Sequence, residues 1–559
     1  MPTARFGRML AALTLLLALL LHARIVSAVL DSDLAAADPP AHFVTGVMVY
    51  DYLQRALGAD PVKFAESYYA AYPKVAFGHW PPTYYGLQAL WYLAVPPAPV
   101  SARILSGLIA AGLALVLFYR LWIRFGGTVA VAACAIFLSI PMIQSASWEV
   151  MSDLLTGFFI FLALFAFSNL LQGEKPRSAA LRFTLWASLA ILTKGSAWAL
   201  GIFVFAAPLL ARRIEIFRNR WYWISGAGMV LFATPFYLVT KKLGLGYPGR
   251  MYDLGPNLSE KLIAFHMFME AGTAVVCIMA LIGFAVALRR RWLGQDQSAA
   301  TSDALVAGAY ILSQIVFLTK FPLTLESRVM IPLLAPAVLL ASHSSVALGR
   351  ALANLTRAAA AAPALLALVC LVNSGAASIR TLHGYGAAVE AIPYGTEPSV
   401  ILVGSGARGE GAMIAERLAR DSSRASVMLR SSRFLAQSRW SGDGYRLLFP
   451  DAGSAREHLL SVPVQYIVVD ETAMEFPHVK LLADAVRGDP ETFALIARRP
   501  VLEIRKPAHA LWSDDDSQRE HAGDLLIYEN RLTGHIRPSL VEVQTGLDRG
   551  GRVFRLKLR

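Results

Sequence analysis

The sequence predicts a polytopic α-helical membrane protein with about eleven transmembrane helices and a C-terminal soluble α/β domain. The first observation is composition: of 559 residues, 56% are hydrophobic and only 16% are charged. One soluble core does not bury that much apolar surface, so a membrane has to cover the rest. The second is a series of apolar runs, and the third is a change to mixed composition after about residue 374.

The expected spans follow one another through short loops, except for one long polar loop after the first. A span needs about 20 apolar residues, and two of the runs fall short of this. The first run also resembles a signal peptide with Ser27 and Ala28 at a cleavage site, but either interpretation puts the loop after it outside. We expect spans near residues 8–30, 101–121, 127–143, 153–171, 181–193, 196–211, 221–240, 262–288, 303–319, 329–347 and 359–374.

Basic residues are concentrated in alternate loops. Cytoplasmic loops normally carry such residues, so the pattern predicts a multi-pass membrane protein with the loop of residues 31–100 on the periplasmic or extracellular side. It also explains the formal net charge of +13 without nucleic acid as a partner. The basic loop residues are Arg120, Arg124, Lys175, Arg177, Arg182, Arg212, Arg213, Arg218, Arg220, Arg289, Arg290, Arg291, Arg350 and Arg357.

Two domains are expected. Residues 1–374 form the membrane domain, including the outer loop of residues 31–100, and residues 375–559 form an extracytoplasmic α/β domain. Its buried-strand runs at 399–403 and 464–470 alternate with helical segments. An odd number of spans places this domain on the same side as the loop.

The outer loop contains our candidate reaction site. Asp38 precedes two prolines, and because Pro39 suits the first position of a helix, Asp38 is expected to cap a helix that carries His42 one turn further on. Capping alone is one interpretation. The other is that Asp38 accepts a proton from an attacking hydroxyl while His42 orients it or a substrate group. Asp31 and Asp33 compete for this role.

Lys74 and His79 precede a Pro-Pro turn and an aromatic run that contains Tyr84. This composition is typical of a chain that re-enters the headgroup region, so interfacial anchoring is one interpretation. The other is that the two cationic side chains bind a phosphate and stabilise charge that builds on it as it leaves.

Ionisable residues also occur at the outer ends of several spans. A charge at the centre of a bilayer costs about 2.5–3.5 kcal/mol on insertion scales, so each lies at the interface or has a partner. Snorkelling explains each one alone, but their shared side predicts a site for an anionic amphiphile. They are Arg24, Glu149, Asp153, Lys194, Glu326 and Arg328.

Residues 404–409 read Gly-Ser-Gly-Ala-Arg-Gly between an apolar strand and a helix, which matches a dinucleotide-binding fingerprint. The next strand ends at Arg430 instead of an acid, and the outer compartment lacks the usual nicotinamide pool. We therefore interpret this segment as a tight turn without a cofactor. No metal ligands are predicted, and the need for a divalent metal stays open. All three cysteines lie in apolar runs, which indicates packing.

Taken together, these segments resemble the GT-C superfamily of integral membrane glycosyltransferases, in the bacterial branch similar to the protein O-mannosyltransferase and lipid A aminoarabinose transferase family. The resemblance covers roughly residues 8–345. Pro39 stands where the family commonly has glutamate, and Trp80 is inserted in a His-Pro-Pro pattern. The resemblance rests on the acidic motif at 38–42, the segment 79–85, Asp153, the turn at 192–195, Glu326, Arg328, Pro332 and Pro336.

This resemblance implies transfer of a hexose or pentose from a polyprenyl-phosphate donor to a lipid, glycan or protein hydroxyl, with inversion at the anomeric carbon. Asp38 is then the general base, assisted by His42, and Asp153 positions acceptor or donor. The donor phosphate-binding residues are Lys74, His79, Arg328 and Lys194, and the other candidates are Asp33, Arg24, Tyr84 and Glu326.

Two other functions remain open. One is a transporter or flippase for lipid-linked sugars, although transporters usually have repeated halves and broken helices near the midplane. The other is a catalytically inactive binding subunit, which Pro39 in the acidic motif favours. We assign the C-terminal domain to acceptor recognition.

Overall fold

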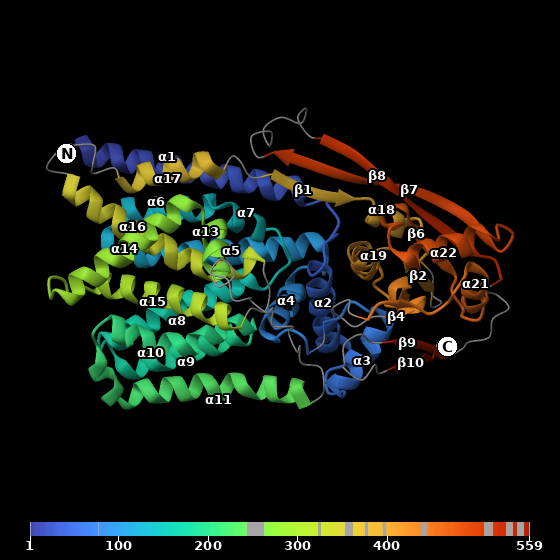
Figure 1. Cartoon of the computed structure of the whole chain (residues 1–559), viewed down its shortest axis with the longest axis horizontal. Coiled ribbons are helices and arrows are strands. Elements are labelled where there is room, and N and C mark those ends of the chain that lie inside the picture. The colour runs from blue at the N-terminus through green and yellow to red at the C-terminus, as the bar shows by residue number, and fades with distance from the viewer. Residues whose placement is uncertain are drawn as a thin grey trace.

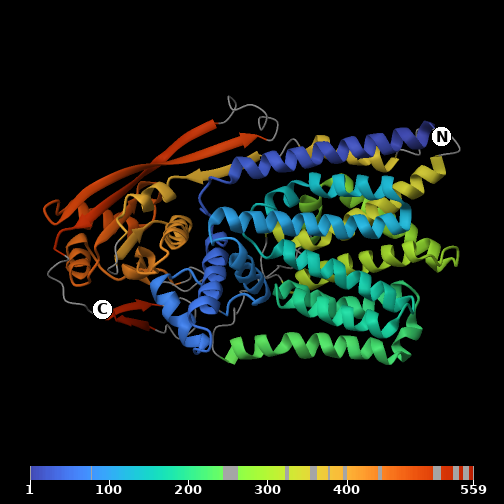
Figure 2. The same cartoon turned by 180° about the vertical axis from the view of Figure 1, so that it is seen from behind.

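The computed structural model describes residues 2–76, 78–242, 262–321, 326–352, 362–374, 378–394, 399–437, 444–507, 518–532, 540–544 and 553–557. A bundle of long helices occupies one end of the molecule and a sheet domain the other, with the helices of the outer loop between them (Figure 1). The view from behind shows the same three parts in the same order (Figure 2). The predicted combination of a helical membrane domain and a C-terminal α/β domain is confirmed.

Each apolar run forms helix in the membrane domain. Within the described residues, five helices are long and apolar enough to cross a membrane, and a bent pair makes a sixth. The chain is therefore a multi-pass membrane protein, while the count of about eleven spans stays a prediction. The membrane-domain helices are α1 (Pro2–Val29), α5 (Pro99–Phe125), α6 (Gly127–Ser139), α7 (Pro141–Ala146), α8 (Asp153–Leu171), α9 (Pro176–Ile191), η1 (Gly195–Ala199), α10 (Leu200–Leu210), η2 (Ile214–Arg218), α11 (Arg220–Lys242), α13 (Ile263–Gly272), α14 (Ala274–Trp292), α15 (Ala299–Lys320), η3 (Ser327–Met330), α16 (Ile331–Leu352) and α17 (Ala362–Ser374).

The outer loop forms three helices, α2 (Pro39–Arg55), α3 (Pro61–Ala71) and α4 (Thr83–Ala94). Both α2 and α3 begin with proline, whose fixed φ suits the first helical turn and whose missing N–H is not needed there. Asp60 caps α3 by accepting hydrogen bonds from two backbone N–H groups. Helix α2 packs on α4 and on a helix of the C-terminal domain, so the loop is a folded layer between the two larger parts.

The C-terminal domain is built on a six-stranded sheet with the order β1-β7-β8-β6-β2-β3. The buried strands β2, β3 and β6 are parallel, and β8, β7 and β1 continue the sheet antiparallel. Its elements are β1 (Ser378–His383), α18 (Tyr385–Glu390), β2 (Val400–Gly404), α19 (Ala407–Arg420), β3 (Val427–Arg430), α20 (Ser431–Phe434), β4 (Ala436–Gln437), β5 (Arg446–Leu447), α21 (Ala452–Leu460), β6 (Tyr466–Asp470), η5 (Glu471–Ala473), α22 (Pro477–Arg487), β7 (Phe493–Pro507), β8 (Gln518–Asn530), β9 (Leu540–Gln544) and β10 (Val553–Lys557).

The outer loop and the C-terminal domain share one hydrophobic core. Phe43 and Val47 of α2 are fully buried in the same cluster as Met413 of α19 and Ile401 of β2. A buried ion pair strengthens this contact, because Asp51 of α2 accepts from Arg424 Nε at 2.7 Å and from Tyr68 Oη at 2.7 Å. Burial of this kind fixes the C-terminal domain over the loop.

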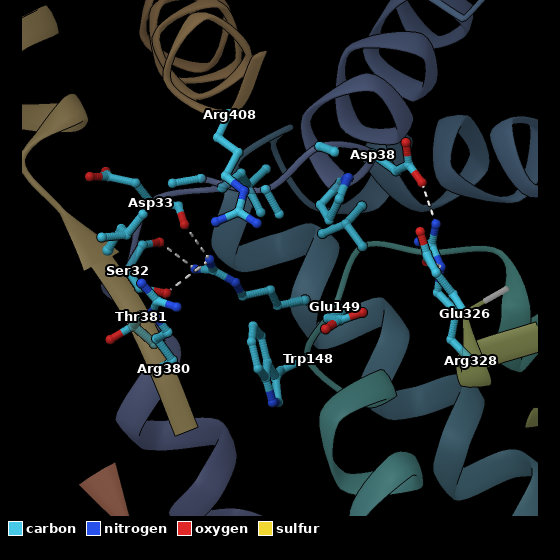
Figure 3. Close-up of a pocket in the computed structure, with 18 residues that line it drawn as sticks. Ser32, Asp33, Asp38, Trp148, Glu149, Glu326, Arg328, Arg380, Thr381 and Arg408 are labelled. Carbon is cyan, nitrogen blue, oxygen red and sulfur yellow. Dashed lines mark hydrogen bonds and ion pairs between the residues drawn. The ribbon is translucent and has the colours of Figure 1, made fainter. Parts of the chain in front are cut away.

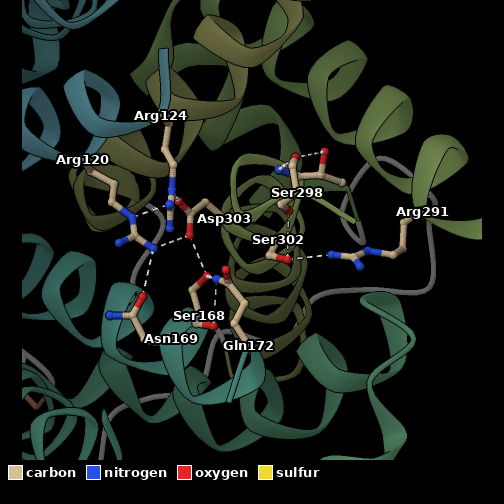
Figure 4. A network of polar contacts seen from close by, with 10 residues as sticks. Arg120, Arg124, Ser168, Asn169, Gln172, Arg291, Ser298, Ser302 and Asp303 are labelled. Atoms are coloured by element: carbon tan, nitrogen blue, oxygen red, sulfur yellow. Dashed lines mark hydrogen bonds and ion pairs between the residues drawn. The ribbon is translucent and has the colours of Figure 1, made fainter. Parts of the chain in front are cut away.

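Polar networks also hold the end of the bundle that lies away from the sheet domain (Figure 4). Arg120 and Arg124 of α5 both pair with Asp303 of α15, at 2.5 and 2.8 Å, and Ser168 Oγ donates to the same carboxylate at 2.6 Å. Two of the arginines assigned to an inner loop are thus partners of a buried acid. Arg120 and Arg124 therefore have a role in helix packing, in addition to fitting the charge pattern expected of a cytoplasmic loop.

Candidate functional site

A cavity of about 350 Å³ lies where the membrane helices, the outer loop and the C-terminal domain meet. Figure 3 shows charged side chains from all three parts around it. It lies at the ends of apolar helices and against the C-terminal domain. It is lined by Ser32, Asp33, Leu34, Ala35, Ala36, Ala37, Asp38, Pro39, Arg103, Trp148, Glu149, Val150, Glu326, Arg328, Arg380, Thr381, Leu382 and Arg408.

Asp38 and Arg328 form the ion pair at one side of this cavity. Asp38 occupies the N-cap position of α2, as expected, but its side chain makes no capping hydrogen bond. Its Oδ2 instead accepts from Arg328 Nη2 at 2.5 Å (Figure 3). Capping alone is therefore the wrong interpretation of this aspartate. Arg328 also pairs with Glu326 and contacts Met151 Sδ.

The ion pair sets the charge of Asp38. Burial by itself raises the pKa of this carboxyl, but the charge of Arg328 and its hydrogen bond outweigh burial and hold the pKa below its ordinary value. Asp38 is therefore ionised near neutral pH. Its side chain keeps 28% of its surface exposed, so the carboxylate is accessible from the cavity.

His42 lies one turn along α2 from Asp38, as expected, and its ring is held by aromatic neighbours. It stacks on Trp80 with ring centroids 4.1 Å apart, and its Nδ1 lies 2.9 Å from Tyr85 Oη. Burial lowers the pKa of His42 to about 3, which makes the ring neutral. The backbone N–H of His42 donates to the Asp38 carbonyl at 3.0 Å, but among the described residues no hydrogen bond joins the two side chains. Its assignment as a helper of Asp38 stays a prediction.

Asp153 and Lys194 form a second ion pair deeper in the membrane domain, with Nζ 2.5 Å from Oδ1. Asp153 begins α8 and Lys194 precedes η1. The pair is close enough to act electrostatically on the first one, since Lys194 affects Asp38 and Asp153 affects Arg328. Neither residue lines the cavity. They form a layer behind the first pair, and their predicted contact with substrate is untested.

Lys74 and His79 lie between α3 and α4 and are likewise outside the cavity lining. Lys74 is 5% exposed and donates to the Ala407 carbonyl at 3.3 Å, so it contacts the start of α19. Burial lowers the pKa of Lys74 to about 7. The His79 ring lies edge-on to Trp80, and burial lowers its pKa to about 4. Binding of phosphate by these two residues also stays a prediction.

The remaining candidates have distinct surroundings. Asp33 lines the cavity, but its two oxygens accept from the backbone N–H groups of Tyr385 and Gly386 at 2.8 and 3.1 Å, so it ties the loop to α18. Tyr84 is fully buried with its ring edge-on to His42, and Glu326 is mostly exposed beside Arg328. The side chain of Arg24 lies outside the described residues.

Sequence reasoning missed three cavity residues or left them without a role. Arg103 is 1% exposed and donates to the carbonyls of Leu30 and Ser32, which shapes the loop entrance. Glu149 lines the cavity, and its burial raises its pKa to about 7. Arg408 is the exposed first-turn residue of α19, and within the described part of the chain it has no hydrogen-bond or ion-pair partner. Glu149 was already among the ionisable residues at the outer ends of expected spans, and Arg103 could have been found as an arginine inside an expected span.

Side chains of the C-terminal domain itself fill the space beside the glycine-rich turn. A Cβ added at Gly404 or Gly406 would stand 2.5 or 2.6 Å from side-chain atoms of Leu482 or Phe476. The Asp470 carboxylate also reaches the turn, where it accepts from Ser405 Oγ at 2.5 Å. These glycines allow close packing, which supports the interpretation of a tight turn. The described residues contain no group of three or more His, Cys, Asp or Glu side chains placed to hold a metal ion.

Chemically, the cavity combines a carboxylate that accepts a proton with guanidinium groups that bind an anion. Asp38 and Glu149 are two of the carboxyl groups in its lining, and Arg328 and Arg408 are two of the cations. Such an arrangement suits transfer of a group away from a phosphate, because one side removes a proton while the other stabilises the departing charge.

Comparison with known proteins identifies the fold. No protein-family model and no curated protein sequence matches the chain. Among solved structures, ArnT from Cupriavidus metallidurans in the apo state has a TM-score of 0.55 at 12% identity, covering 94% of this chain and 99% of that one. The same protein bound to undecaprenyl phosphate gives a TM-score of 0.52 at 13% identity over the same shares. The oligosaccharyltransferase of Archaeoglobus fulgidus is more distant, with a TM-score of 0.45 at 12% identity over 87% of this chain and 71% of that one. The match to ArnT extends over nearly the whole of both chains, and the chain therefore has the GT-C fold that its sequence motifs predict.

Proposed function

We propose that this protein is an inverting glycosyltransferase that moves a sugar from a polyprenyl-phosphate donor to a hydroxyl of a lipid, glycan or protein. The observation that carries the proposal is the Asp38–Arg328 pair at the junction between apolar helices and a polar domain. A donor of this kind has a long apolar tail and a charged phosphate, so it suits a cavity that lies at the ends of apolar helices and has arginines in its lining. ArnT, which shares the fold, has been crystallised with undecaprenyl phosphate.

The chemistry divides between the two partners of the pair. Asp38 takes the proton from the acceptor hydroxyl, whose oxygen bonds to the anomeric carbon. The bond from that carbon to the phosphate oxygen breaks on the opposite face of the sugar, and the electron pair leaves with the phosphate. Arg328 then stabilises the negative charge on that phosphate through charge-assisted hydrogen bonds.

Donor binding has to open the ion pair. Inversion needs the base and the leaving phosphate on opposite faces of the sugar, whereas Asp38 and Arg328 are 2.5 Å apart in the structure. Transfer of Arg328 from the carboxylate to the phosphate frees Asp38 and removes the contact that lowers its pKa. The proposal therefore links phosphate binding to activation of the base.

We place the site on the outer side of a bacterial inner membrane, with the C-terminal domain above it. The distribution of arginines between loops supports this orientation. The proposed donor phosphate-binding residues are Arg328 and Arg408 at the cavity, with Lys194 adding charge behind them. Lys74 and His79 are proposed as further hydrogen-bond donors, because burial lowers the pKa of His79 to about 4 and that of Lys74 to about 7. Whether the sugar is a hexose or a pentose depends on contacts that only a bound donor defines.

The C-terminal domain takes part through Arg408. Replacing Arg408 by glutamine is expected to weaken donor binding about tenfold, because one charge-assisted hydrogen bond to phosphate contributes about 1.5–3 kcal/mol. The side chain is exposed and has no described partner, so the melting temperature should stay unchanged. Donor affinity is measured with the purified full chain. Arg531→Gln, at an exposed arginine of the same domain that lies outside the cavity, is the matched control.

Glu149 is expected to make donor binding depend on pH. Its pKa of about 7 means that it is neutral below this pH and negative above it. A phosphodiester donor keeps one charge throughout, so its affinity should fall as the pH rises from 6 to 8 through repulsion by the ionised carboxylate. The Glu149→Gln variant should lose most of this pH dependence, and what remains is expected from Lys74, whose pKa is also about 7. An undiminished pH dependence in this variant would assign the effect to another group.

Lipids that co-purify with the protein test the proposed donor class. Mass spectrometry of the gently purified full chain is expected to find a polyprenyl phosphate, with or without a sugar, and to find much less of it in Arg328→Gln. Recovery of phospholipids alone, in equal amounts from both proteins, would count against a polyprenyl-phosphate site.

A further inference from the structure

A second cavity, of about 260 Å³, lies at the end of the membrane domain away from the C-terminal domain, and we call it the distal pocket. It is formed where α5, α14 and α16 end and α15 begins, so it does not overlap the candidate site at the outer loop. It is lined by Arg124, Phe125, Arg290, Asp296, Ser298, Ala300, His343, Val346, Ala347 and Arg350.

Cations exceed anions in and around the distal pocket. Arg124, Arg290 and Arg350 line it, whereas Asp296 is the carboxylate in its wall. The oxygens of Asp296 already accept from Ser298 N at 2.8 Å and from Thr301 Oγ1 at 2.5 Å. Within the described part of the chain, Arg290 and Arg350 have no side-chain hydrogen bond or ion pair. Both guanidinium groups therefore have donors left for an anion.

Arg124 leaves additional positive charge at the back of the pocket. It shares the single carboxylate of Asp303 with Arg120 (Figure 4), so this group of three carries one net positive charge. The first turn of α15 adds to the field, since Ala300 lines the pocket at the N-terminus of this helix, where Ser298 Oγ accepts from Thr301 N at 3.3 Å.

His343 supplies an independent sign of a ligand. Its side chain is 5% exposed and lines the pocket, and its Nδ1 is buried without a hydrogen-bond partner among the described residues. The ring lies edge-on to Phe125 with centroids 6.0 Å apart, which holds its orientation. A buried polar atom without a partner costs about 1–3 kcal/mol. An oxyanion in the pocket gives the Nδ1–H tautomer an acceptor.

The surface around the pocket suits a lipid. Trp122 and Ile123 of α5 and Leu348 of α16 are exposed close in sequence to the residues that line it. Exposed tryptophan and aliphatic side chains beside arginines are typical of the level where acyl chains meet headgroups. A ligand with a phosphate in the pocket would lay its apolar part on these side chains.

We propose that the distal pocket binds a phosphate ester, supplied by the headgroup of an anionic membrane lipid, with Arg290, Arg350 and His343 as its ligands. Basic pockets between transmembrane helices recognise anionic headgroups through such contacts. The lipid would bridge the ends of α14, α15 and α16 and so stabilise the bundle at the end opposite to the candidate active site.

Lipid titration of the detergent-purified full chain, followed by native mass spectrometry, tests this site. Dioleoylphosphatidylglycerol should bind the unaltered protein more tightly than dioleoylphosphatidylcholine, which carries no net charge. Replacing Arg290 and Arg350 together by glutamine should weaken phosphatidylglycerol binding at least about tenfold. Arg289→Gln is the matched control, because Arg289 is exposed on the same helix and does not line the pocket.

Two substitutions of His343 test the site if the double variant does not fold. His343→Asn keeps an N–H donor near the position of Nδ1 and should retain binding, whereas His343→Leu should lose it. Inorganic phosphate distinguishes the two sources of the anion. If millimolar phosphate competes with phosphatidylglycerol, free phosphate also binds in the distal pocket. If it does not compete, the pocket is a site for lipid headgroups. Equal binding of the two lipids, or equal losses in Arg289→Gln and the double variant, would overturn the proposal.

Discussion

Replacing Asp38 by asparagine is expected to lower the rate of sugar transfer by about 10²–10⁴-fold, the usual contribution of a positioned general base. The amide keeps the size of the side chain but no longer accepts the proton of the acceptor hydroxyl. It also keeps an oxygen that accepts from Arg328, so the protein should insert and fold as before. The measurement is a transfer assay with the purified variant and a polyprenyl-phosphate sugar, compared at equal protein concentration.

Asp31→Asn is the matched control for this experiment. Asp31 is an exposed carboxylate of the same loop and does not line the cavity, so its loss should leave transfer unchanged. Asp33 is unsuitable as a control because its carboxylate holds the start of α18. Full turnover by Asp38→Asn would remove Asp38 from the mechanism, whatever the donor.

Replacing Arg328 by glutamine is expected to reduce kcat/KM for the donor about 30-fold or more, since loss of one partner of a desolvated charge pair costs about 2–5 kcal/mol and this pair is partly buried. The phosphate loses its proposed guanidinium ligand, and Asp38 loses the contact that lowers its pKa. Burial then dominates, so the pKa of Asp38 rises. A base acts only when deprotonated, and the acid limb of the pH–rate profile should therefore move to higher pH.

Arg328→Lys separates charge from geometry. It keeps the positive charge but not the planar fork, so it should restore the position of the acid limb and only part of the donor affinity. If Arg328 had only a structural role, its substitution would change stability but leave the acid limb of the pH–rate profile where it is in the unaltered protein. An unmoved acid limb in Arg328→Gln, with the fold intact, would therefore exclude the proposed link between Arg328 and Asp38.

Much of the fold follows from local sequence because helix formation in a membrane depends on local composition. The apolar runs predicted the membrane helices, and Pro39 predicted the start of α2. The parallel strands β2 and β6 were likewise visible as short buried runs. The number of membrane crossings was not predictable in the same way. Several helices are shorter than a membrane span, so the number of crossings does not follow from hydropathy alone.

The site was less predictable, because its charges meet across large separations in the chain. Asp38 looked like a helix cap, but its partner Arg328 lies 290 positions away and turns the carboxylate away from the backbone. Asp33 had the same chemistry and serves instead to hold α18. Arg408 lay inside a glycine-rich turn whose pattern pointed to a nucleotide, and nothing local indicated that α19 packs over the cavity.

The central claim is that a polyprenyl phosphate binds with its phosphate between Arg328 and Arg408. A structure of the full chain with undecaprenyl phosphate, determined by electron cryomicroscopy, tests it directly. We expect density for the phosphate in the cavity at the outer loop, with the guanidinium of Arg328 turned from Asp38 towards it. Phosphate density only in the distal pocket, with the Asp38–Arg328 pair still closed, would contradict the account.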